Sequence, residues 1–134
     1  MAKIAIPLLN NKEEEGEFIE NAIKGVKEVV LILVVDMNAT TENFGFATSQ
    51  ISHGSEAIEK IKKSLQMKGI SVEDVQEWGD TFSKINTTAK LKQVKKIVVK
   101  AQDNQYFRNL IKKLKGEKYD VEVIKETSPL TESP

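Results

Sequence analysis

The sequence contains no cysteine, a single histidine (His53) and no long apolar run. The absence of cysteine excludes disulfides, thiol catalysis and thiolate metal sites, and one histidine excludes a cluster of histidine ligands. The longest apolar run, residues 29–35, is far shorter than the roughly 20 residues of a membrane-spanning helix. Residues 1–7 are interrupted too early by Pro7 to form a secretory signal. We therefore expect a cytoplasmic protein without membrane contact.

Neither sign of charge is in excess, because 20 Lys and Arg balance 20 Asp and Glu over 134 residues. No global charge points to a nucleic acid or a membrane partner. A local basic run extends from Lys90 to Lys100, and further lysines follow at 112–118. Arg108 is the only arginine and aromatic residues are scarce nearby, so we interpret this run as a solvated face rather than a nucleic-acid site.

What is present is an alternation of apolar strands and amphipathic helices. Strands are predicted at residues 3–9, 29–35 (within the segment 28–37), 70–78, 94–101 and 119–124, with helices between them. The first helix is predicted to begin at Asn10 or Asn11, with glutamates 13–15 in its first turn. Its apolar stripe consists of Phe18, Ile19, Ala22, Ile23 and Val26. A cap at Asp103 or Asn104 is predicted to begin the fourth helix, which ends at Gly116.

Five strands alternating with four helices predict an α/β fold, a three-layer α/β/α sandwich around a five-stranded parallel sheet. The two most apolar strands should be central and the polar third strand peripheral, which favours the strand order 3-2-1-4-5. We expect one domain over residues 1–125. The composition of residues 126–134 predicts a disordered tail.

In such a sheet, ligands bind outside the carboxyl ends of the strands, where the direction of winding reverses. This topology brings six polar residues to one crevice: Asn10, Asn11, Asp36, Gln102, Asp103 and Asn104. Their amides and carboxylates could bind a polar ligand or a divalent cation through oxygen, although the commoner role of such residues is to cap helices and form turns. The sequence does not identify the small-molecule ligand. No nucleophile and base have a catalytic spacing, so we expect no catalytic residues and no enzyme.

The segment that follows the fourth strand, residues 102–105, contains no glycine. A phosphate cradle usually needs glycines, because backbone N–H groups must approach the phosphate closely. A helix N-terminus still attracts anions, but Asp103 as the cap would place negative charge there. This segment therefore argues against phosphate binding.

Three short motifs resemble one known family. They are the opening Lys3-Ile4-Ala5-Ile6-Pro7, the strand exit Trp78-Gly79-Asp80 with Ile85 and Ala89 after it, and the buried strand Lys96-Ile97-Val98-Val99. Together they resemble the universal stress protein family over residues 3–124. The resemblance implies a winding of the adenine nucleotide alpha hydrolase-like or flavodoxin-like type. A carrier of the iron–molybdenum cofactor type opens with a similar strand, but the rest of that family matches this chain poorly.

Two departures from the family pattern determine what the resemblance implies for function. ATP-binding members carry an aspartate just after the first-strand proline, whereas Leu8 and Leu9 follow Pro7 here. They also carry a Gly-x-x-Gly stretch after strand four, whereas no glycine precedes Gly116 in that region. The resemblance therefore implies the non-ATP-binding branch, which has no cofactor and works by dimerisation and partner contacts. The alternative is a nucleotide- or metabolite-binding module that uses the crevice at strands one and four.

The last strand, which runs from Tyr119 to Ile124, is predicted to be an open edge of the sheet. It alternates polar and apolar residues, and nothing in it blocks pairing. Pairing with the same strand of a second copy would remove the exposed edge. The resemblance implies the same contact, so we expect a homodimer through this strand.

Overall fold

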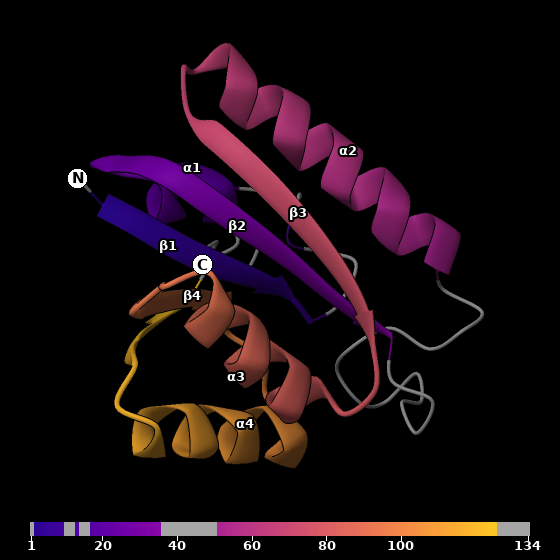
Figure 1. Ribbon diagram of the computed structural model, residues 1–134, viewed down its shortest axis with the longest axis vertical. Helices are drawn as coiled ribbons and strands as arrows, with labels where there is room; N and C mark the ends of the chain where they lie inside the picture. The colour runs from indigo at the N-terminus through magenta and orange to yellow at the C-terminus, as the bar shows by residue number, and fades with distance from the viewer. Residues whose placement is uncertain (1, 10–12, 14–16, 36–50, 126–134) are drawn as a thin grey trace, which may run out of the picture.

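The computed structural model describes residues 2–9, 13, 17–35 and 51–125. Strands and helices alternate along these residues as β1 Ala2–Leu8, α1 Phe18–Ala22, β2 Val26–Val35, α2 Ile51–Met67, β3 Ser71–Trp78, α3 Thr81–Leu91, β4 Lys96–Lys100, α4 Gln105–Gly116 and β5 Asp120–Ile124. All neighbouring strands are parallel, in the order β3-β2-β1-β4-β5 (Figure 1). The predicted fold class and strand order are confirmed. Residues 126–134, the predicted tail, lie outside the described residues.

The core lies on both faces of the sheet, because alternate residues of a strand point in opposite directions. In β1, Ile4 and Ile6 contact one hydrophobic cluster and Ala5 contacts the other. Helices α1 and α2 cover the first face, and α3 and α4 cover the second (Figure 1). The central strand β2 is buried over its last seven residues, which explains its continuous apolar sequence.

The first helix is shorter than its apolar stripe predicts. It covers only Phe18–Ala22, and Gly25 follows with φ +74°. That left-handed residue turns the chain, so Val26 begins β2 instead of extending the helix. Glu13 does not lie in an exposed first turn either, since its side chain is buried and accepts a hydrogen bond from the Leu9 N–H. The sequence places Val26 in the helix because the apolar residues of β2 continue the spacing of the helical stripe without a break.

The polar third strand is an edge strand, as predicted. Its carboxylates form ion pairs with lysines from the helices on both faces: Asp74 with Lys62 of α2, Glu77 with Lys84 of α3, and Glu73 with Lys92 just after α3. Charged side chains on an edge strand discourage pairing with another chain. The charges of β3 therefore protect this edge of the sheet against pairing with another chain.

Helix α2 ends in a turn that favours glycine. Gly69 has φ +79°, and the N–H groups of Gly69 and Ile70 donate to the carbonyls of Gln66 and Leu65. This pair of hydrogen bonds is the Schellman arrangement, which satisfies carbonyls that the end of a helix leaves open.

Helices α3 and α4 end in the same turn without glycine. Gln93 and Lys118 stand at the left-handed position, with φ +59° and +70°. The same two hydrogen bonds form after each helix, from Gln93 to Lys90 and Val94 to Ala89, and from Lys118 to Lys115 and Tyr119 to Leu114. A residue with a Cβ costs roughly 1–2 kcal/mol in this conformation, which glycine adopts freely. Both connections therefore carry strain that the turn after α2 avoids.

Candidate functional site

The reversal of strand order, where the crevice is predicted, lies between β1 and β4, which are neighbours in the sheet. The helices that follow these two strands cover opposite faces of the sheet, because β1 leads to α1 and β4 leads to α4. Of the six predicted site residues, the structure brings Gln102, Asp103 and Asn104 together at the start of α4. Asn10, Asn11 and Asp36 lie outside the described residues.

Asn104 is the residue that caps α4. Its backbone is extended, with φ −154° and ψ +160°, and its side-chain Oδ1 accepts a hydrogen bond from the Phe107 N–H at 2.7 Å. An asparagine in this conformation satisfies one of the four backbone donors that the start of a helix leaves open. The cap is therefore neutral. Of the two caps predicted for this helix, Asn104 is confirmed, and Asp103 does not serve as the cap.

Asp103 faces solvent instead. Its side chain is fully exposed, and Oδ1 accepts from Nη1 of Arg108 at 3.2 Å. Arg108 is one turn into α4, so the carboxylate is matched by a cation on the same helix. The negative charge that Asp103 was expected to place at the helix start is thus largely compensated. The absence of glycine remains the main obstacle to a phosphate here.

Gln102 has a buried hydrogen-bond donor without a partner. Its Oε1 accepts from Nδ2 of Asn104 at 3.1 Å, whereas its Nε2 is inaccessible to solvent and has no acceptor among the described residues. A buried polar group left unsatisfied costs roughly 1–3 kcal/mol. A ligand or a water molecule that offers an acceptor to Nε2 would recover that cost. Among the described residues of the predicted site, Gln102 therefore has a side-chain N–H donor that is available to a ligand.

Glu13 is a buried carboxylate close to the end of β1 that the sequence did not reveal. Its side chain is only 1% exposed, and Oε2 accepts from the Leu9 N–H at 2.8 Å, directly after β1 ends. In the sequence, three consecutive glutamates resemble an exposed helix start, and nothing distinguishes the first of them. The carboxylate lies near the reversal point, where a ligand of this fold would bind.

Two further properties of the described residues bear on function. No three or more His, Cys, Asp or Glu residues in these ranges lie close enough to hold a metal ion. None of the helices within the same ranges is long and apolar enough to cross a membrane.

No family model and no curated protein sequence matches this chain. Several solved structures do match over nearly its full length. A universal stress protein family protein from Arabidopsis thaliana with AMP bound is 16% identical, with a TM-score of 0.69, and the match covers 99% of this chain and 97% of that one. A protein of the same family from Burkholderia pseudomallei is 15% identical, with a TM-score of 0.63 and coverage of 92% and 95%.

The universal stress protein UspA from Lactobacillus plantarum is 14% identical, with a TM-score of 0.61 and coverage of 94% and 97%. Identities this low establish a common fold rather than a common activity. Sheet order, helix layers and these three relatives agree, and the chain therefore has the universal stress protein fold.

Proposed function

We propose that this chain is a small cytoplasmic protein of universal stress protein type that does not bind ATP. It acts through homodimerisation and through binding a partner or ligand, and it is not an enzyme. The observation that carries the proposal is the glycine-free entry into α4. There the side chain of Asn104 already engages the Phe107 N–H, which is one of the donors that a phosphate would use.

The open edge at β5 supports the dimer. Asp120 donates its N–H to Lys95 and Ile124 accepts from the Ala101 N–H, so both residues bond toward β4. Because alternate residues of a strand bond in opposite directions, the backbone groups of Val121 and Val123 point to the open edge. The Val123 side chain is also exposed. An unpaired edge of this kind is a template for a second strand, and a two-fold contact would satisfy it.

Native mass spectrometry of freshly purified protein tests both parts of the proposal together. We expect the mass of a dimer and no retained nucleotide. In the variant Val123→Pro, an N–H at the open edge is removed while the bonds to β4 stay, so the dimer should become a monomer. Val123→Thr keeps the N–H and the branched side chain and should remain a dimer. Copurified ATP or AMP would overturn the proposal, as would a dimer in Val123→Pro.

A second candidate function is a nucleotide- or metabolite-binding module that uses the crevice at the carboxyl ends of β1 and β4. The unpartnered Nε2 of Gln102 favours it, and the Arabidopsis relative contains AMP. A ligand that binds only the folded protein raises the unfolding temperature with the logarithm of its concentration.

AMP is therefore the first compound to test in thermal unfolding. If the crevice binds it, the shift should grow with AMP concentration and disappear in Gln102→Leu. The variant Gln66→Leu, at an exposed position on α2, is the matched control and should keep the shift. No shift at any AMP concentration would remove this candidate.

A further inference from the structure

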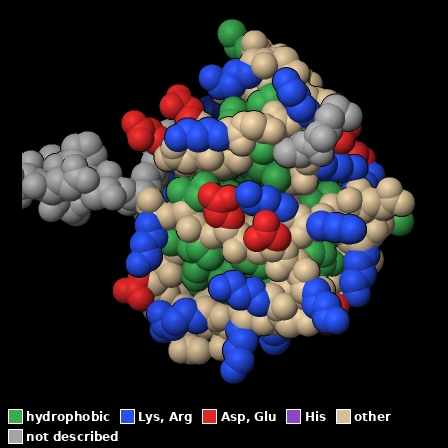
Figure 2. All heavy atoms as spheres, turned by 90° about the vertical axis from the view of Figure 1, so that its left-hand side faces the viewer, with side chains coloured by type: hydrophobic (Ala, Val, Ile, Leu, Met, Phe, Trp, Pro, Cys, Tyr) green, Lys and Arg blue, Asp and Glu red, His purple; other side chains and the backbone are tan. Residues whose placement is uncertain are grey.

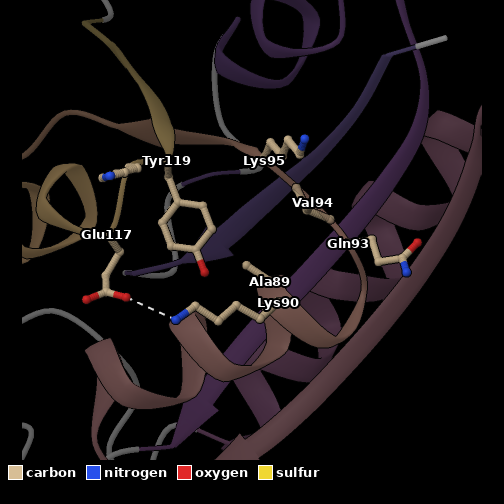
Figure 3. A pocket seen from close by; sticks show the side chains of 8 residues that line it. Ala89, Lys90, Gln93, Val94, Lys95, Glu117 and Tyr119 are labelled. Carbon is tan, nitrogen blue, oxygen red and sulfur yellow. Dashed lines mark hydrogen bonds and ion pairs between the residues drawn. The ribbon is translucent and has the colours of Figure 1, made fainter.

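A hollow lies at the opposite end of the sheet from the crevice, where β4 and β5 begin. Its volume is about 720 Å³, and it is bounded by the turn after α3 and the turn after α4. Ala89, Val94 and the ring of Tyr119 form its apolar part. In Figure 3 the Tyr119 ring points from the start of β5 toward Ala89 on α3. Its hydroxyl bonds to the Asn86 backbone and side chain, at 3.1 and 2.7 Å, which fixes the ring in this position.

The remaining wall is positively charged. Three lysines and one glutamate line the hollow, and Lys90 pairs with Glu117 across it at 3.0 Å (Figure 3). Hydrogen bonding to Glu117 raises the pKa of Lys90, so that lysine stays protonated. The ammonium groups of Lys95 and Lys118 form no ion pair or hydrogen bond with any described residue. The hollow thus carries two unmatched positive charges in a chain whose net charge is zero.

The surrounding surface has the same character. Figure 2 shows the side of the molecule that lies on the left in Figure 1, where β1 begins, and lysine side chains gather there around hydrophobic ones. Each lysine alone is an ordinary solvated residue. The fold brings together lysines from the turn after α3 and from the turn after α4, beside one group of apolar side chains.

The two strained turns lead to this hollow. Gln93 and Lys118, the residues with a left-handed backbone in place of glycine, both line it. Glycine would make both turns without strain, as Gly69 does after α2. Residues with a strained backbone persist only where the surrounding structure holds them, and they cluster at binding sites. Both residues that replace glycine are thus among the lining residues of one hollow, although they belong to two different connections.

We propose that this hollow binds a small organic anion with an apolar ring. The ring would pack against Tyr119, above the buried side chains of Ala89 and Val94, and its acidic group would pair with Lys95 or Lys118 at the rim. The volume lies within the range of small-molecule sites. The last carbonyls of α3 and α4 already accept hydrogen bonds in their turns, so they do not compete for the lysines.

The probe is 2-naphthoate, with neutral 2-naphthamide as its matched analogue, added to isotope-labelled full-length protein and followed by amide chemical shifts. We expect saturable shifts at residues 89–95 and 117–119, with a dissociation constant on the order of 1 mM, as the size of the probe allows. Naphthamide should bind at least about five-fold more weakly, and added salt should weaken naphthoate only. Equal binding of the two compounds, or shifts centred on residues 101–105, would overturn the proposal.

Variants separate a binding role from a structural one. Lys118→Gly should weaken naphthoate binding about five-fold or more and leave the unfolding temperature unchanged or higher, because glycine relieves the turn. Lys95→Gln should weaken binding, whereas Lys112→Gln, an exposed lysine on α4 outside the hollow, should not. If Lys118→Gly lowers the unfolding temperature and keeps full affinity, the side chain is structural and the proposal fails.

Discussion

Replacing the residue that caps α4 tests the geometry of the crevice most directly. Asn104→Ala removes the acceptor of the Phe107 N–H and the donor to Oε1 of Gln102. Loss of an asparagine cap typically costs about 1 kcal/mol, within a range of roughly 0.5–2 kcal/mol. The helix has 12 residues and buries Phe107, Leu110 and Leu114, so tertiary packing keeps it folded and the full cap energy appears in the measured stability.

For a domain of this size, 1 kcal/mol corresponds to a fall of about 3–5 °C in Tm. Asn104→Asp keeps an oxygen at the same position and should retain most of the stability. Asp103→Ala should leave the unfolding midpoint nearly unchanged, because its carboxylate is fully exposed and such ion pairs contribute little.

Urea unfolding followed by circular dichroism at 222 nm measures all three variants under one condition. The expected order of stability is wild type, then Asp103→Ala and Asn104→Asp close to it, with Asn104→Ala clearly lowest. A larger loss in Asp103→Ala than in Asn104→Ala would refute the assignment of the cap. The conclusion that an uncharged residue caps α4 would then be wrong as well.

Three other predictions concern different parts of the molecule. Glu13→Ala leaves the buried Leu9 N–H without its acceptor and should cost about 1–3 kcal/mol in urea unfolding, whereas the exposed Glu20→Ala should cost almost nothing. Leu65→Ala, at a fully buried position of α2, should lower the free energy of unfolding by about 2–5 kcal/mol. Leu91→Ala, at the exposed last residue of α3, should change it little. Stability should fall above about pH 10, because burial raises the pKa of Tyr119 above 10.0 and the hydrogen bond to Glu122 raises that of Lys96 above 10.5. For the lysine, the favourable charged form is complete below pH 10.5 and is lost as pH rises through the higher folded pKa; for the tyrosine, only the unfolded chain ionises near pH 10. Urea midpoints between pH 8 and 11 check this, and a flat profile would contradict it.

The sequence was sufficient for the sheet order because burial differs strongly among the strands. Residues 29–35 are apolar without interruption, which requires a strand covered on both faces, and Glu73, Asp74 and Glu77 make β3 an edge. These signals come from composition alone. They do not depend on how any side chain is oriented.

The local errors arise where two residues compete for one role. Asp103 and Asn104 are both good caps, and only the backbone path decides which one reaches the Phe107 N–H. Val26 continues a helical stripe and also begins a strand, and Gly25 decides between them through its positive φ. The burial of Glu13 is not visible in the sequence, because the three consecutive glutamates 13–15 look alike there and only the fold turns the first of them toward the Leu9 N–H. The hollow could not be predicted from the sequence either, because its walls come from the segment after α3 and the segment after α4.

The position of glycine along the chain connects these observations. At the carboxyl ends of the strands, where related folds hold phosphates, the entry into α4 has Gln102, Asp103 and Asn104 in place of glycine. At the amino ends, the turns after α3 and α4 have Gln93 and Lys118 where glycine would be less strained. The first substitution obstructs a ligand, since side chains occupy the place of backbone donors. The second adds an amide and an ammonium group to an apolar hollow. Lys95 and Lys118 therefore line a hollow at the end of the sheet opposite to the entry into α4, where an anion would meet ammonium groups rather than a helix start.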